Sequence, residues 1–122
     1  PVNSYAWSKY FGECFCPAGS LIIRGSWFNP KKIPRRALTD SWTSKIPVVD
    51  AAWYVSRLIL SGVAGIFNIG GPRRTYYDIF HKLDKTIEPI ERDDLDLLYS
   101  FPRDTSLNCD KLHYFLQIPN QL

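Results

Sequence analysis

Residues 1–13 read PVNSYAWSKYFGE, and this stretch decides how the rest of the chain is interpreted. It places Tyr5 and Lys9 four residues apart, which puts both side chains on one face of a helix. A free phenol titrates near pH ~10, but a cation within a few ångströms favours the phenolate. Such a pair can give a proton to a carbonyl oxygen or take one from an alcohol. The bare spacing also fits an exposed Lys one turn after a half-buried Tyr.

The residues around this pair resemble a known catalytic segment. The pattern Pro-x-Asn-x-Tyr-x-x-Ser-Lys-x-x-Gly-Glu is similar to that of the extended short-chain dehydrogenase/reductases of nucleotide sugars, with Ala6 where Gly is common. Four later segments resemble, in the same order, segments of the dTDP-4-dehydrorhamnose reductases. They are LIIRGSW at 21–27, IPVVDAA at 46–52, GIFNIGG at 65–71 and PRDTSLNCDKL at 102–112.

The resemblance implies an activity and two catalytic residues. Tyr5 would donate a proton to a keto group on a nucleotide-linked sugar, while NADPH or NADH supplies the hydride. Lys9 would lower the pKa of the Tyr and bind the nicotinamide ribose. An epimerase or dehydratase would use the same pair, and some proteins of this fold are non-catalytic subunits or scaffolds. All three remain as hypotheses.

The resemblance also suggests substrate-binding residues, each with an alternative. Trp27 would lie against the sugar, or it is an ordinary core residue. Arg103 would bind the diphosphate through its planar guanidinium, or it pairs with Asp104 on the surface. The reductases more often carry Arg just before the Pro of this signature, where this chain has Phe101. A basic loop that contains Arg35 and Arg36 would face an anionic substrate, or it is simply solvated.

One part of the family pattern is absent from this sequence. Dinucleotide-binding domains hold the pyrophosphate on a Gly-rich turn after a strand. No Gly-x-x-Gly-x-x-Gly or Gly-x-Gly-x-x-Gly occurs here, and Pro72 removes a donor after Gly70 and Gly71. We therefore expect an α/β C-terminal portion of a Rossmann-like reductase, lacking the cofactor half and inactive alone. The chain begins at Pro1 without Met, so it has lost its initiator or is a piece of a longer protein.

Composition predicts one soluble domain over residues 1–122. No apolar run or leader indicates a membrane span or a signal peptide, and three cysteines suit a reducing, cytoplasmic setting. The Cys and His residues lack zinc-site spacing, so we expect no metal. Net charge is only +3, with the cations gathered in one short loop, so we expect no nucleic-acid partner.

The periodicity predicts alternating helices and strands, which favours parallel pairing. Helices are expected at about 4–15, 48–60, 75–83, 93–99 and 108–116, strands at 21–24, 66–69 and 86–91, and a loop at 25–47. Two central strands alone leave an open sheet edge. With 15% aromatic residues also in need of cover, we expect a homo-oligomer or a partner chain.

Overall fold

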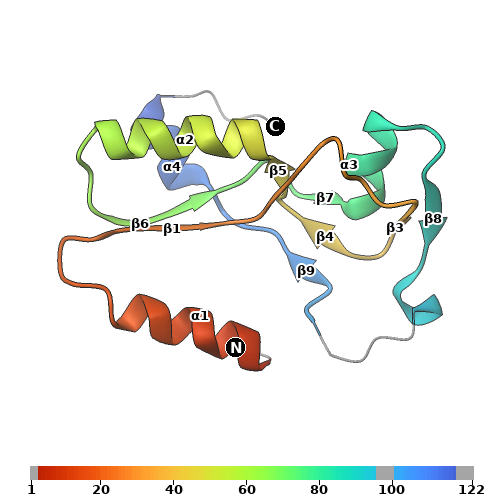
Figure 1. Cartoon of the computed structure of the whole chain (residues 1–122), viewed down its shortest axis with the longest axis horizontal. Coiled ribbons are helices and arrows are strands. Elements are labelled where there is room, and N and C mark those ends of the chain that lie inside the picture. Colours follow the sequence, from red (N-terminus) through yellow and green to blue (C-terminus); the bar gives the residue numbers. More distant parts are fainter. Residues whose placement is uncertain (1–2, 96–100, 118–122) are drawn as a thin grey trace.

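Two parallel strands form the centre of the chain in this computed structural model, which describes residues 3–95 and 101–117 (Figure 1). β1 (Leu21–Gly25) pairs with β6 (Gly65–Ile69), and Ile23 lies opposite Phe67. α2 (Val48–Leu60) and α4 (Asp110–Leu116) lie on one side of this pair, and α1 (Ser4–Cys14) lies on the other. The α/β class, the parallel pairing and the helical flanks expected from the sequence are confirmed.

The larger core fills the space between the strand pair and its two covering helices. α2 repeats apolar residues at helical spacing, so that one face of the helix meets the strands. The buried residues of this larger core are Ile46, Ala51, Leu58, Phe67, Ile69 and Leu112. A smaller core lies under α3 (Tyr76–Leu83) and contains Ala37, Ile79, Phe80 and Ile87.

Residues 25–47 are not the loop that the sequence predicted. They contain four short strands: β2 (Trp27–Phe28), β3 (Arg36–Leu38), β4 (Trp42–Thr43) and β5 (Ile46–Pro47). β2 pairs with β5, β3 pairs with β8 (Glu88–Ile90), and β4 lies between β7 (Arg74–Thr75) and β9 (Asp104–Thr105). Strands of two or three residues show no alternation in the sequence, because distant partners rather than local preference make them extended.

The helix predicted over 93–99 is wrong at its start. A single 3₁₀ turn, η1 (Arg92–Asp94), occupies this place, and Leu95 is extended at φ −100° and ψ 127°. The remainder of that prediction lies outside the described residues. β8 confirms the edge strand expected around Pro89, because within the described residues it pairs only with β3.

The predicted start of α3 and the predicted end of α2 are confirmed. The Thr75 side chain accepts a hydrogen bond from the Asp78 N–H, and the Asp78 carboxylate accepts one from the Thr75 N–H. α2 ends before Gly62, which takes a φ of +66° that a residue with a side chain rarely adopts.

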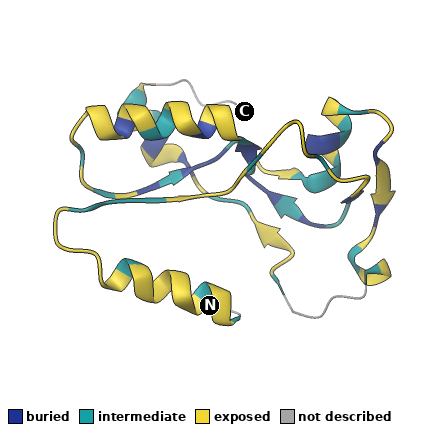
Figure 2. Ribbon diagram, viewed as in Figure 1, coloured by how far each residue is buried: buried dark blue, intermediate teal, exposed yellow. Residues whose placement is uncertain are grey.

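α1 is the least covered of the described α-helices (Figure 2). None of its residues is buried, and Trp7, Tyr10 and Phe11 stay exposed. The three rings contact one another, with Trp7 stacked on Phe11 at 5.5 Å between centroids. Within the described residues β1 pairs only with β6. The chain therefore carries an uncovered aromatic helix face beside a two-stranded sheet.

Candidate functional site

α1 brings Tyr5 and Lys9 together as the spacing predicts. The Ala6 N–H donates to Oδ1 of Asn3 at 2.8 Å, and this cap starts the helix just before Tyr5. Lys9 Nζ then lies 5.2 Å from the centroid of the Tyr5 ring. Tyr5 is 70% exposed, so its hydroxyl is open to a molecule that approaches the helix.

The two polar residues and the aromatic face occupy different sides of α1. Trp7 follows Tyr5 by two residues, which is about 200° around a helix. Tyr5 and Lys9 therefore point away from the Trp7, Tyr10 and Phe11 rings. A ligand at the first pair and a partner at the rings would not compete for the same face.

An ion pair connects α1 to the central strands. Nε of Arg24, on β1, donates to Oε1 of Glu13 at 2.8 Å, and Nη2 of the same guanidinium donates to Oε2. The Arg24 hydrogen bonds lower the pKa of Glu13. Glu13 and Arg24 belong to two separate sequence motifs, and the sequence did not predict their contact. A bidentate pair fixes orientation better than a single contact, so it orients the helix that carries Tyr5.

Trp27 lies where β1 ends and β2 begins, at 44% exposure. Its ring packs against Gly25, where an added Cβ would lie 3.0 Å from a Trp27 ring atom and 2.8 Å from the Ile69 oxygen. In the described residues no hydrogen bond, ion pair or ring contact joins Trp27 to Tyr5 or Lys9. Its exposure shows that Trp27 is not an ordinary core residue, which was the alternative.

Arg103 does not pair with Asp104, so the alternative drawn from the sequence is wrong. Its Nη2 lies 3.7 Å from Oδ2 of Asp40 and 3.5 Å from Oδ1 of Asp93. Asp104 pairs instead with Arg73, at 2.8 Å. Arg103 is therefore shared between two carboxylates, and these compete with any diphosphate.

Arg35 and Arg36 are both exposed, and only Arg36 lies in a strand. Arg36 belongs to β3, and the carbonyl oxygen of Arg35 accepts the Glu88 N–H at 3.0 Å. β3 lies beside α3 and β8, away from α1 (Figure 1). The structure therefore does not bring these two arginines to Tyr5 and Lys9.

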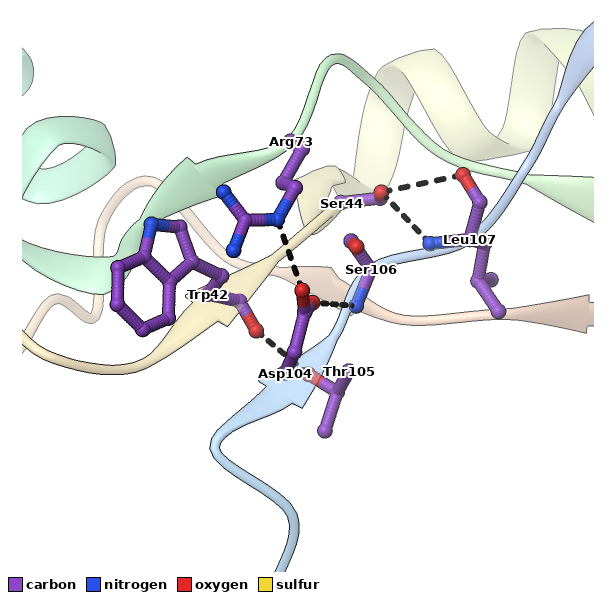
Figure 3. A network of polar contacts seen from close by, with 7 residues as sticks. All are labelled: Trp42, Ser44, Arg73, Asp104, Thr105, Ser106 and Leu107. Atoms are coloured by element: carbon purple, nitrogen blue, oxygen red, sulfur yellow. Dashed lines mark hydrogen bonds and ion pairs between the residues drawn. The ribbon is translucent and has the colours of Figure 1, made fainter.

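A polar network that the sequence did not predict holds the segment 104–107 in place (Figure 3). Asp104 accepts from Ser106 and from Arg73, whose guanidinium lies 4.6 Å from the Trp42 ring centroid. The hydrogen bonds from Ser106 and then Arg73 lower the pKa of Asp104 to about 2.

The same network also reaches Trp42 of β4 and Ser44, the residue that follows this strand. The Thr105 hydroxyl donates to the Trp42 carbonyl oxygen at 3.1 Å, and the Leu107 N–H donates to Oγ of Ser44 at 2.9 Å. The motif PRDTSL was visible in the sequence, but its partners Arg73, Trp42 and Ser44 lie 31 to 63 positions away. Only the folded chain shows that it is a structural clamp.

No protein-family model matches this sequence, and no curated protein matches it. Solved structures do match its fold. The chain aligns over 98% of its length with half of a hypothetical dTDP-4-dehydrorhamnose reductase from Sulfolobus tokodaii, at 24% identity and a TM-score of 0.81. This chain has the fold of half such a reductase.

Two further reductase structures give the same result. That from Bacillus anthracis, in complex with NADP, matches 94% of this chain and 50% of its own, at 17% identity and a TM-score of 0.75. That from Yersinia enterocolitica matches 88% of this chain and 48% of its own, at 19% identity and a TM-score of 0.72. The chain thus spans about half the length of these proteins, as the sequence motifs suggested.

The described residues contain neither a membrane-spanning helix nor a cluster of metal ligands. No helix there has the length and apolar character that a membrane span requires. No three His, Cys, Asp or Glu side chains in those residues gather as metal ligands. Cys14 and Cys16 are exposed free thiols, and Cys109 is a buried one.

Proposed function

We propose that this chain is the substrate-side portion of an NAD(P)H-dependent reductase of nucleotide-linked sugars. The observation that carries the proposal is the contact between Tyr5 and Lys9 on an exposed helix face, in a chain with the fold of half a dTDP-4-dehydrorhamnose reductase. Epimerases and dehydratases would use the same two residues. The three matching structures, all of dTDP-4-dehydrorhamnose reductases (one of them hypothetical), favour reduction.

In this proposal Tyr5 is the acid. Its exposed hydroxyl donates a proton to the carbonyl oxygen of the sugar, so that an O–H bond forms while the carbonyl carbon gains a hydride. Bound NADPH or NADH supplies that hydride. The charge of Lys9 beside the ring stabilises the phenolate that remains. Trp27, half exposed at the start of β2, offers a flat surface to the C–H side of the sugar.

The residues of this chain suit only the nicotinamide-ribose end of the cofactor. No described carboxylate lies within ion-pairing distance of Lys9, so its ammonium can donate to the hydroxyls of the nicotinamide ribose. The Gly-rich turn for the pyrophosphate is not in the sequence. We therefore propose that the chain alone neither binds the cofactor tightly nor reduces sugars, and that the cofactor half must be supplied.

The test has two stages. Titration of NADPH fluorescence with the purified chain should show no saturable binding, and micromolar saturation would contradict this part of the proposal. The chain is then mixed with a dinucleotide-binding half taken from a matching reductase. Tyr5→Phe should abolish any activity that appears, because Phe keeps the ring but carries no proton. Tyr10→Phe is the matched control, because Tyr10 lies on the aromatic side of α1 and should keep full activity.

A second candidate is a non-catalytic subunit or scaffold of the same fold. The exposed Trp7, Tyr10 and Phe11 face of α1 and the two-stranded sheet favour it, because both need cover from another chain or a second copy. The two candidates differ in one result. A scaffold would bind its partner equally well with Tyr5→Phe and would show no Tyr5-dependent turnover.

A further inference from the structure

A hollow lies between the larger and the smaller core of the chain. Its volume is about 610 Å³, within the range of small-molecule sites. Its walls come from β2, from the segment leading into β5, and from α2, β7 and α3. Residues far apart in the sequence meet there, so the hollow is a product of the fold.

This hollow is separate from the Tyr5–Lys9 face. None of the six site residues predicted from the sequence lines it. Phe28 does line it, and Phe28 follows Trp27 directly in β2. Successive side chains of a strand point to opposite faces, so Trp27 faces away from the hollow. Phe28 packs edge-on against Phe80 of the smaller core, 5.2 Å between centroids.

The charged residues around the hollow are mostly positive. Lys45, Arg74 and Lys82 line it, against a single carboxylate from Asp50. In the described part of the chain none of the three cations has a carboxylate within ion-pairing distance. Lys45 Nζ lies 5.5 Å from the centroid of the Tyr76 ring, but no described carboxylate neutralises it. Three cations without a carboxylate partner around one concave surface repel one another, and an anion placed among them relieves that repulsion.

The backbone at the hollow adds to this preference. α2 begins there at Pro47, which has no side-chain cap to offer to the first-turn N–H groups. The positive end of a 13-residue helix therefore lies beside the three cations. Gly70 and Gly71 also line the hollow, and a Cβ added at Gly70 would lie only 2.7 Å from the Cβ of Ser44.

Two aromatic side chains of α2 line the hollow together with these cations. The Trp53 ring is 47% exposed and meets the Tyr54 ring edge-on at 5.2 Å. A half-exposed Trp in a concave wall offers a flat surface to another ring. Charge and aromatic surface together suit a molecule with a phosphate and a planar group.

We propose that this hollow between α2 and α3 binds a small phosphate-bearing molecule, through Lys45, Arg74 and Lys82. The site is additional to the proposed reductase site and does not depend on Tyr5. The phosphate is the part that the cations recognise, whether it arrives as the free ion, on a sugar or on a mononucleotide. A planar base would gain a further contact with Trp53.

The test is calorimetric titration of the purified chain with inorganic phosphate, glucose 6-phosphate and a mononucleotide, at one fixed ionic strength. Saturable binding of at least one of them is expected. Lys82→Gln should weaken it about tenfold, because the variant loses one charge-assisted hydrogen bond to the phosphate. Arg74→Gln together with Lys82→Gln should remove it. Tighter binding of the mononucleotide, lost in Trp53→Ala, would identify the base as part of the ligand.

Lys85→Gln is the matched control. Lys85 is an exposed lysine three residues after Lys82, and it does not line the hollow. Binding should be unchanged in Lys85→Gln and in Tyr5→Phe. The proposal is overturned if none of the three phosphates binds at millimolar concentration. It is also overturned if Lys85→Gln weakens binding as much as Lys82→Gln, which would indicate diffuse charge attraction. Because Lys82 is exposed, circular dichroism should show an unchanged fold in these variants.

Discussion

Leu58→Ala tests whether this chain closes its own core. Leu58 is 0% exposed on α2 and packs among the side chains of the larger core. The change removes three carbons, and at about 0.8 kcal/mol per buried methylene this costs roughly 2.4 kcal/mol. A residual cavity of about 30 Å³ would add somewhat less than 1 kcal/mol. We therefore expect the free energy of unfolding to fall by about 3 kcal/mol.

Leu60→Ala is the matched control for this change. It lies on the same helix and makes the same substitution, but Leu60 is 82% exposed. Its effect should stay within about 0.5 kcal/mol. Urea unfolding followed by circular dichroism measures both variants, and the Leu58 variant should also melt roughly 10 °C lower. The reasoning is refuted if Leu58→Ala costs less than 1 kcal/mol, because the core over β6 would then not be packed in solution.

Two further predictions concern acid stability and assembly. The pKa of Asp104 is lowered to about 2 from 3.8, so its stabilising effect is fully present above about pH 4 and is lost as the pH falls through 2. The melting-temperature difference between the parent chain and Asp104→Asn should therefore shrink between pH 4 and pH 2. Asp94→Asn, at an exposed position, is the control, and its melting-temperature difference from the parent chain should not change over this range. Light scattering at low micromolar concentration should show a homodimer or larger species, and Trp7→Ala with Phe11→Ala should shift it toward the 14.1 kDa monomer. A monomeric parent chain would show that the exposed face of α1 needs no cover.

The elements that could be predicted from the sequence carry their information locally. α2 repeats apolar residues at helical spacing, and α3 carries its own capping box in Thr75 and Asp78. β1 and β6 are apolar runs bounded by glycine and turn residues. The start of the helix predicted over 93–99 is wrong, because a run of acidic and apolar residues gives no firm signal and the chain is extended at Leu95.

The contacts of the candidate site also divide into local ones, which the sequence could predict, and long-range ones, which it could not. The Tyr5–Lys9 contact depends only on a four-residue spacing within one helix, so the sequence could indicate it. Arg103 could not be paired correctly, because Asp40 lies 63 residues earlier, whereas the neighbouring Asp104 is held by Arg73. An ion pair depends on where two chain segments come to lie in the folded protein. The identities of an Arg and an Asp do not reveal that position.

The sequence by itself determined the α/β class, the main helices, the two central strands and the residues that resemble a reductase's catalytic pair. These follow from spacings of two to four residues, over which the geometry of the backbone is fixed. Only the tertiary structure decided the short strands between 25 and 47, the Arg73–Asp104 clamp, the Glu13–Arg24 pair and the basic hollow beside α2. Each of these joins segments that are distant in the chain, and their contacts form only when burial of the two cores brings those segments together.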